Sequence, residues 1–323
     1  MVTIPAMNKL SNNSKRKYIG EAALLLMTII WGGTFVIVKE SLNDISSMLF
    51  IAFRFGIAAL VMSILIVIWK KKVDAASLKA GIFLGFLLFL GFATQTVGLK
   101  FTSATKSGFI TGSLVVMVPI FQTIIFRKAP TKGALIGTLL VFAGLIFLSS
   151  GGNSVFSLLS ELGNNFSFGD TLTLICAAFF ALHVVYIGVI TPKHDFVVLV
   201  FLQVVTASVF SFIASFIFEA ASFEPLHIDL TNYLLFGLLY TGLLATVVNL
   251  GLQTRFQKEV TPTKAGIIYS FEPIFAAIFA FFLLNEKITN FEFIGSTLIF
   301  SGLLVSEIYD QLIKRNGNER VSG

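Results

Sequence analysis

The sequence has few charged residues, one cysteine and three histidines. Charged side chains make up 12% of its 323 residues, about half of the roughly 25% that soluble domains carry. The single cysteine, Cys176, excludes an internal disulfide, and the histidines stand too far apart for a metal-ligand motif. The chain also lacks a GxxxxGK(S/T) phosphate loop and a paired nucleophile and histidine. These shortages argue against a soluble protein, an ATP-driven pump, a metal centre and a cofactor-dependent enzyme.

Long apolar runs take the place of charge. Hydrophobic residues amount to 56%, and the mean hydropathy is +0.90. A helix needs about 20 mostly apolar residues to cross the hydrocarbon core of a bilayer, and runs of this length recur along the chain. The sequence therefore predicts an all-α polytopic membrane protein with ten transmembrane helices. The predicted spans are about 22–39, 47–69, 80–98, 105–126, 132–150, 169–190, 196–218, 232–253, 264–284 and 291–309.

The predicted spans divide five and five around one polar stretch, "GGNSVFSLLSELGNNFSFGD". This division predicts a first five-helix repeat at 21–150, a linker at 151–168 and a second five-helix repeat at 169–309. Residues 1–20 and 310–323 are predicted to be short polar tails. The first span has no small-residue cleavage site, so we expect it to be retained as a helix and not removed as a signal peptide.

Lysine and arginine are distributed unevenly between the two sides of this arrangement. With the N-terminus inside, 18 of the 23 basic residues fall in inner segments, 4 in outer segments and Arg54 within a span. Cytoplasmic loops carry such an excess, so both tails are expected to be cytoplasmic. The net charge of +6 then marks the cytoplasmic side of a bilayer and does not indicate a nucleic-acid partner.

Two similar stretches lie 158 residues apart, "TKSGFITGSLVVMVP" at Thr105–Pro119 and "TKAGIIYSFEP" at Thr263–Pro273. The similarity continues in "GFATQTVGLKF" and "TVVNLGLQTRF" before them, and in "IGTLLVFAGLIFLSS" and "IGSTLIFSGLLVSE" after them. A match over three consecutive helices indicates an internal duplication. Because each half has an odd number of spans, the halves are predicted to be inverted repeats, which are a recurrent transporter architecture.

Several stretches resemble the drug/metabolite transporter superfamily, EamA type. They are "WGGTFVIVKESL", "FIAFRFGIAAL", "FEPIFAAIFAFFLLNEKIT" and "FIGSTLIFSGLL", each at its place in the five-plus-five arrangement over about residues 22–309. The resemblance implies a ten-helix permease for small metabolites in a bacterial plasma membrane, with amino acids as one candidate class and export as the direction. One departure is "IFRKAPT" in the first half, where the second half has the family's acidic turn, "LLNEKIT".

Two ionisable residues stand well inside predicted spans. Arg54 lies in the span 47–69, and Glu272 lies in the span 264–284 directly before Pro273. Such residues are costly in hydrocarbon and are functional candidates by default. Arg54 is a candidate for binding a substrate carboxylate, with outward snorkelling as the alternative. Glu272 is a candidate for proton coupling or for binding an ammonium group, with a structural hydrogen bond to a neighbouring helix as the alternative.

Four more residues complete the candidate substrate-binding set: Trp31, Gln95, Asn249 and Tyr269. Gln95 and Asn249 fall near equivalent positions of the two halves, and they either hydrogen-bond a solute or join helices. Trp31 and Tyr269 offer aromatic walls for an amphipathic solute. Most aromatic residues of this phenylalanine-rich chain are expected to face lipid or to fill the bundle.

Lys106 and Lys264 stand at the start of equivalent spans, Lys106 on the outer face and Lys264 on the inner face. A helix N-terminus is an unfavourable place for a positive charge. Each lysine is therefore a candidate gate or entrance residue, with a plain interfacial anchor as the alternative. Pro119 and Pro273 are predicted to kink their helices, because proline removes an intrahelical hydrogen bond.

These features favour a secondary carrier that works by alternating access and is not an enzyme. Its expected partners are a small-molecule solute, the lipid bilayer and protons as a candidate coupling ion, and it is expected to be a monomer or a homodimer without cofactor. The alternative hypothesis is a membrane-embedded lipid-handling protein or enzyme. That alternative needs a polar catalytic cluster, for which only the scattered acids of "KESLND" and "NEKITN" are available.

Overall fold

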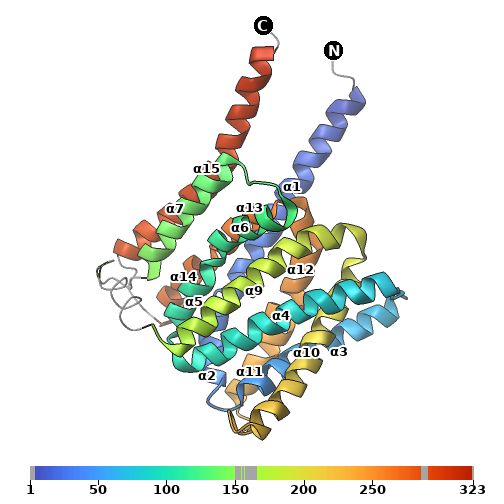
Figure 1. Ribbon diagram of the computed structural model, residues 1–323, viewed down its shortest axis with the longest axis vertical. Coiled ribbons are helices and arrows are strands. Elements are labelled where there is room, and N and C mark those ends of the chain that lie inside the picture. Colours follow the sequence, from blue (N-terminus) through green and yellow to red (C-terminus); the bar gives the residue numbers. More distant parts are fainter. Residues whose placement is uncertain (1–3, 150–153, 155, 157–165, 285–289, 322–323) are drawn as a thin grey trace.

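A computed structural model describes residues 4–149, 154, 156, 166–284 and 290–321 of the chain. Over these residues the polypeptide is mainly helical, and the helices form one bundle (Figure 1). An isolated antiparallel bridge pairs Ile45 with Ile228 in the connections that follow α2 and α10. Most of the linker predicted at 151–168, and the acidic turn at 285–289, lie outside the described residues.

The first half begins with two helices in line and continues to α7. Its helices are α1 Ile4–Trp31, α2 Thr34–Ser41, α3 Ser47–Ile68, α4 Ala75–Phe101, α5 Ala104–Gly112, α6 Leu114–Phe126 and α7 Lys132–Ser149. The helical residues of α1 start within the predicted N-terminal tail.

The second half repeats this order from α9 to α15. Its helices are α9 Phe168–Ile190, α10 Phe196–Ala220, α11 Asn232–Leu239, α12 Asn249–Phe256, α13 Pro262–Tyr269, α14 Glu272–Leu284 and α15 Asn290–Val321. A π-helix, Tyr240–Val248, joins α11 to α12, and single 3₁₀ turns, Thr191–Lys193 and Gln257–Glu259, follow α9 and α12. Helix α15 continues through most of the predicted C-terminal tail.

The helices match the ten predicted spans. Within the described part of the chain, seven helical stretches are long and apolar enough to cross a membrane: Arg16–Ser41, Ser47–Ile68, Ala75–Phe101, Lys106–Phe126, Phe168–Lys193, Phe196–Ala220 and Asn232–Glu259. Two shorter apolar helices, Lys132–Leu148 and Phe293–Ser306, correspond to the fifth and tenth spans. The ninth span consists of α13 and α14 in sequence.

Helix starts recur in the two halves with the same capping geometry. Ser103 caps α5 and Thr261 caps α13, each by accepting a hydrogen bond from the backbone N–H three residues later, and the two caps lie 158 positions apart. Asp74 and Thr231 cap α4 and α11 in the same way but lie 157 positions apart. Such side-chain oxygens satisfy the unpaired N–H groups of a first helical turn. The caps therefore show which positions of the two halves are equivalent: the spacing is 157 at the start of α4 and α11, and 158 at the start of α5 and α13.

The first helices of the two halves align with a shorter spacing. Gly20 of α1 lies against the carbonyl of Phe256, and Gly169 of α9 lies against the carbonyl of Gly98. The two glycines are 149 positions apart, and their partners are 158 positions apart. A helix of each half therefore packs on the other half through an equivalent close contact.

Helices of the first half pack side by side with helices of the second half. Helix α7 packs along α15, α4 along α9, and α3 along α10. Between α7 and α15, Gly144 lies against the carbonyl of Gly295, and Gly137 lies against the carbonyl of Gly302. Small residues let membrane helices approach this closely. Gly137 is equivalent to Gly295 and Gly144 to Gly302, so a pseudo-twofold axis passes between the two helices.

Equivalent elements lie at opposite ends of the bundle. Figure 1 shows both termini at one end, where α1 enters, α15 leaves and α13 begins. Helices α5 and α9 begin at the other end. We call these the termini end and the far end of the bundle.

Candidate functional site

Three spans are interrupted inside the bundle. Helix α1 gives way to α2 at Gly32–Gly33, α5 to α6 at Ser113, and α13 to α14 at Ser270–Phe271. Ser113 and Phe271 are 158 positions apart, so the last two interruptions are equivalent. Discontinuous helices free backbone groups within a span and are a recurrent way of building a solute site in transporters.

The π-helix Tyr240–Val248 is the main difference in backbone between the halves. The interval from Thr231 to Thr261 holds one residue more than the interval from Asp74 to Ser103. A π-helical segment accommodates such an extra residue inside a helix, often at a functional site. Residues before the π-helix therefore match the first half at a spacing of 157, and residues after it match at 158.

A cavity lies between the interrupted helices. Its volume, counted as the space open to the centres of water molecules, is about 80 Å³, whereas a single water needs roughly 10–15 Å³ by this measure. Much of its lining comes in equivalent pairs with one member from each half. These pairs are Trp31 and Phe180, Thr34 and His183, Gln95 and Gln253, Thr111 and Tyr269, and Leu114 and Glu272. The cavity therefore lies on the pseudo-twofold axis.

Arg54 reaches the cavity from α3 and is 4% exposed. Its Nε donates to Thr246 Oγ1 at 2.9 Å, and the Thr246 hydroxyl donates to the carbonyl of Thr241 at 2.7 Å. The guanidinium carbon lies 4.4 Å from the ring centre of Phe92 and 5.5 Å from that of Phe55. Within the described residues the terminal nitrogens have no hydrogen bond and are not sealed from the cavity. A guanidinium in this setting can receive an anion through two N–H groups.

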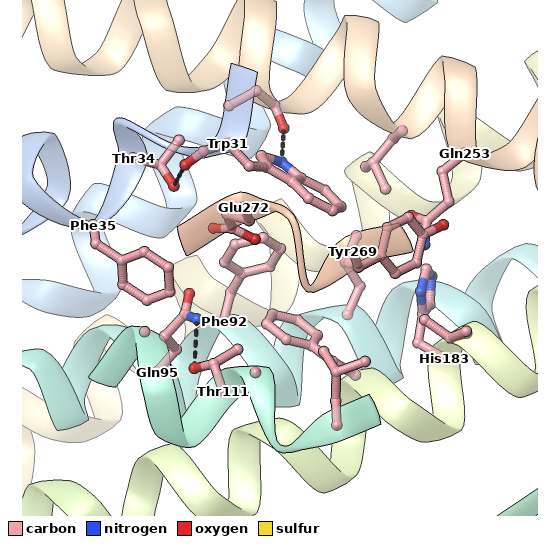
Figure 2. Close-up of a pocket in the computed structure, with 18 of the residues that line it drawn as sticks. Trp31, Thr34, Phe35, Phe92, Gln95, Thr111, His183, Gln253, Tyr269 and Glu272 are labelled. Carbon is pink, nitrogen blue, oxygen red and sulfur yellow. Dashed lines mark hydrogen bonds between the residues drawn. The ribbon is translucent and has the colours of Figure 1, made fainter. Parts of the chain in front are cut away.

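Glu272 supplies the opposite charge from the first residue of α14. Figure 2 shows its side chain in the middle of the labelled residues, below Trp31 and above Gln95. The positive end of the helix dipole favours a carboxylate there. Arg54 and Glu272 interact electrostatically but form no ion pair within 4.0 Å. Glu272 has no hydrogen bond to any residue that the structure describes. The cavity therefore presents its positive and negative charges at separate points.

Two equivalent amide side chains flank Glu272 on opposite sides of Figure 2. Gln95 Nε2 donates to Thr111 Oγ1 at 3.3 Å, and Gln95 is only half-buried. Gln253 is 3% exposed, and its Nε2 donates to Gln257 Oε1 at 3.1 Å. The same Gln257 oxygen accepts a hydrogen bond of 2.8 Å from the Tyr269 hydroxyl. The Gln95 amide is therefore accessible from the cavity, whereas the Gln253 amide is buried and hydrogen-bonded to Gln257.

Trp31 closes another side of the cavity. Its Nε1 donates to the carbonyl of Ala245, in the π-helix, at 3.0 Å. Its ring meets that of Tyr269 edge to face, with 5.8 Å between the ring centres. Since Thr246 holds Arg54, the π-helix orients two lining side chains through neighbouring residues.

Five of the six predicted substrate-binding residues line this cavity: Trp31, Arg54, Gln95, Tyr269 and Glu272. Asn249 does not, because its Nδ2 donates to the carbonyl of Met27 at 3.1 Å and joins α12 to α1. The residue equivalent to Gln95 is Gln253, one helical turn beyond Asn249. Pro119 lies inside α6, beyond the interruption at Ser113, and Pro273 is the second residue of α14.

Each repeated lysine forms an ion pair with an acidic residue of the other half. Lys106 Nζ lies 2.8 Å from Asp170 Oδ2 at the far end, and Lys264 Nζ lies 2.5 Å from Glu21 Oε1 at the termini end. Glu21 and Asp170 are 149 positions apart, so the two pairs are equivalent. The carboxylates offset the unfavourable place of a lysine at a helix N-terminus.

Gln253, Thr246, Asp170 and Glu21 are absent from the residues predicted from sequence. The sequence contains a signal for three of them. Glu21 and Asp170 each follow a glycine, in "IGEAA" and "FGDTL", and Gln253 repeats the "QT" of Gln95 in "LQTRF". Thr246 has no such signal, because its position depends on the π-helix.

Comparison with known proteins is consistent with this geometry. The sequence profile of the EamA-like transporter family matches residues 18–150 and again 167–307. The chain belongs to the EamA-like transporter family. An uncharacterized transporter of Archaeoglobus fulgidus is 32% identical over 90% of this chain and 86% of its own length. The uncharacterized transporter YoaV of Bacillus subtilis is 26% identical over 88% and 94%.

A solved crystal structure shares the fold with a TM-score of 0.70 and 15% identity, over 91% of this chain and 98% of the other. The two EamA matches coincide with the two halves, so the prediction of a ten-helix protein made of two repeats is confirmed. Membership of a transporter family also confirms that the chain is a multi-pass membrane transporter and not a member of an enzyme family.

Proposed function

We propose that this EamA-family transporter is a secondary exporter of small metabolites that carry both a carboxylate and an ammonium group, with amino acids as the leading class. The supporting observation is the separation of Arg54 and Glu272 in one cavity on the pseudo-twofold axis. Among the residues that the structure describes, the terminal N–H groups of Arg54 have no hydrogen bond and are offered to a carboxylate, and the carboxylate of Glu272 has none and is offered to an ammonium group. Export, as the direction, rests on the resemblance to exporters of the family.

The remaining lining supports a solute that also has an apolar part. Trp31, Phe92 and Tyr269 surround the two charges with aromatic surface, and Gln95 adds one accessible amide. A site that leaves buried polar groups unpaired when the wrong solute enters discriminates strongly. A purely cationic solute would leave Arg54 without a partner, and a purely apolar solute would leave both Arg54 and Glu272 without one.

We propose that the two equivalent ion pairs are the gates of an alternating-access cycle. Each joins one half to the other at one end of the bundle, so one pair must open to admit solute from that end. The excess of lysine and arginine supports a cytoplasmic termini end. Lys264 with Glu21 would then close the cytoplasmic entrance, and Lys106 with Asp170 the outer entrance.

Glu272 is also the candidate for proton coupling. It is partly exposed to the cavity and can exchange a proton with a solute ammonium group or with water there. Replacing it with glutamine removes the charge and keeps the size. Glu272→Gln is therefore expected to remove the response of flux to a pH gradient; unchanged flux and pH dependence would contradict both roles.

The central test is solute flux in proteoliposomes. Purified protein is reconstituted and assayed against amino acids, their amides, the matching amines and carboxylic acids, nucleobases and cationic drugs, with and without a pH gradient. Zwitterions are expected to be carried, while analogues that lack either charge are carried at least about tenfold less, which is one missing interaction of 1.4 kcal/mol. Equal flux of amine, acid and zwitterion would overturn the proposed solute class, and no flux of any solute would overturn the transport proposal.

The gates are tested by exchanging charges. Asp170→Lys is expected to abolish flux by placing like charges together, and adding Lys106→Asp restores it if the pair itself matters. The same exchange at Glu21 and Lys264 is the matched experiment at the other entrance. Failure of both exchanged pairs to regain flux, in protein that inserts normally, would contradict the gate proposal.

The orientation has an independent test. Cys176→Ala gives a cysteine-free chain, in which a cysteine at Ser14 is expected to react only when the membrane is permeabilised. Labelling of that cysteine from outside intact cells would reverse the assignment of the two entrances.

A further inference from the structure

The halves differ most sharply at one polar position near the termini end. Gln257 is fully buried and accepts hydrogen bonds from both Gln253 and Tyr269. Its own Nε2 donates to the carbonyl of Val184 in α9 at 2.6 Å. At the spacing of 158, the residue equivalent to Gln257 is Leu99, which is 1% exposed and has no amide to offer. We call the three hydrogen bonds of the Gln257 side chain the clamp. The first half has no equivalent of it at Leu99.

The two equivalent amides differ in hydrogen bonding and in exposure. Within the described part of the chain, Gln95 makes one side-chain hydrogen bond, to Thr111, and it is half-buried beside the cavity. Gln253 is 3% exposed, and its amide nitrogen is bound to Gln257. Both residues line the same cavity. The Gln95 amide is therefore accessible from the cavity, whereas the Gln253 amide nitrogen is occupied by its hydrogen bond to Gln257.

We infer that Gln253 is a second solute-binding amide, which contacts the solute carboxylate when the termini end opens, and that Gln257 withholds it until then. The inference rests on the proposed alternating-access function. In a cycle built from inverted repeats, equivalent residues of the two halves meet the solute in turn as the two ends open. Gln253 then takes the present place of Gln95, and Tyr269 that of Thr111.

The hydrogen bonds that Gln253 and Tyr269 lose on opening are replaced by bonds to the solute. A carboxylate accepts from the Gln253 amide and from the Tyr269 hydroxyl, so neither polar group is left unpaired in the opened cavity. Without a solute, both groups return to the Gln257 oxygen. The clamp therefore links solute occupancy to the closing of the termini end.

The first half itself supplies the variant that tests the clamp. Gln257→Leu installs the residue found at the equivalent position, Leu99. In a Cys176→Ala background, Gln253→Cys reports how exposed this position is while Gln257 still bonds to Tyr269 and Val184, through its rate of reaction with a membrane-permeant maleimide. Adding Gln257→Leu is expected to raise that rate at least about tenfold, and saturating zwitterionic solute is expected to slow it again. Gln95→Cys in the same backgrounds is the matched control and should react at a rate that Gln257→Leu leaves unchanged.

Flux then separates a binding role from a structural one. Gln253→Ala is expected to raise the KM for the carried solute about tenfold with a smaller change in kcat, and Gln253→Asn to recover part of the loss. A cysteine at position 253 that stays unreactive in the Gln257→Leu background, or a Gln253→Ala variant with unchanged KM, would overturn the inference.

The two levels of the proposal fail in different ways. If the wild-type protein carries no solute, the transport proposal fails, while the labelling rates still test whether Gln257 withholds Gln253. If the wild-type protein carries solute and the labelling is insensitive to Gln257, only the present inference fails. Melting temperatures of the variants show whether a loss of flux comes from misfolding.

Discussion

Arg54 and Thr246 belong to opposite halves of the chain, and Arg54 Nε donates to Thr246 Oγ1 at 2.9 Å. Thr246 stands in the π-helix Tyr240–Val248, which packs against α3. The Thr246 hydroxyl is itself fixed by donating to Thr241. The Arg54 guanidinium is therefore held by a residue of the π-helix, and the described residues of the first half contain no such helix.

Thr246 should therefore control anion binding without touching the anion. Thr246→Val removes the acceptor and keeps the shape, and a hydrogen bond to a charged group contributes about 1.5–3 kcal/mol. We expect KM to rise roughly 10- to 100-fold with a smaller effect on kcat, measured by flux in proteoliposomes. Thr246→Ser keeps the hydroxyl and should stay near wild type. Equal loss in both variants would show that packing, and not the hydrogen bond, matters.

The two equivalent ion pairs, Lys106 with Asp170 and Lys264 with Glu21, should contribute unequally to stability. The Asp170 side chain is fully buried, and besides pairing with Lys106 it accepts from Thr102 and from the backbone N–H of Ser167. Removing one partner of a buried pair costs about 3–5 kcal/mol, so Asp170→Asn should fall near the lower end of this range. The Glu21 side chain is 20% exposed, and Glu21→Gln should cost roughly half as much or less.

The measurement for the ion pairs is unfolding in detergent micelles followed by circular dichroism. The informative quantity is the difference between the two variants, since both lose one carboxylate at an equivalent place. A larger destabilisation from Glu21→Gln than from Asp170→Asn would contradict this account of burial.

The crossing of α7 and α15 leaves no room for a side chain. A Cβ added at Gly295 would lie 2.5 Å from the backbone nitrogen of Leu148, so Gly295→Val must separate the helices. Overpacking of this kind costs about 1–3 kcal/mol. Gly251 of α12 meets nothing within 4 Å, and Gly251→Ala should be neutral or stabilise by about 0.5–1 kcal/mol, because alanine favours helix. Thermal unfolding of the two variants in the same detergent provides the comparison.

One connection outside the spans should make stability depend on pH. Burial opposes ionisation of Asp195, but the hydrogen bond from Lys71 and those from the backbone of Val197 and Val198 prevail, and the pKa of Asp195 is lowered. A lowered pKa contributes stability that is present above the ordinary value of about 3.9 and is lost as the pH falls through the folded-state pKa.

Asp195→Asn isolates this charge, because asparagine still caps a helix. The difference in melting temperature between wild type and Asp195→Asn should be present at pH 6 and shrink as the pH falls below about 4. A difference that stays constant down to pH 3 would show that the ion pair with Lys71 contributes nothing.

Span number, duplication and the two lysines follow from hydropathy and from the repeated "TKSGF" and "TKAGI", because length in hydrocarbon and internal similarity are local properties. The interruptions at Ser113 and Phe271 do not follow, because neither residue forbids a helix. The two prolines differ as guides, since Pro273 is the second residue after the interruption at Phe271, whereas Pro119 stands inside α6, six residues beyond Ser113.

The candidate site was predictable where charge in an apolar span stands out, as at Arg54 and Glu272. Gln253 was missed because Gln95 was matched with Asn249, 154 positions along the chain, whereas the spacing of 158 between Lys106 and Lys264 leads from Gln95 to Gln253. The partners of the lysines depend on the approach of helices from opposite halves, which no single stretch of sequence reveals.

The contacts between Gly144 and Gly295 and between Gly137 and Gly302 are exchanged by the pseudo-twofold axis. Each lysine likewise finds its acid in the other half. Two copies of one five-helix unit, inserted in opposite directions, could make every one of these contacts without a covalent link. Because both units belong to one chain, their antiparallel pairing is fixed when the chain is synthesised. Each unit can also differ from the other, as the π-helix, Glu272 and Gln257 do, whereas in a symmetric dimer any such change would occur in both subunits.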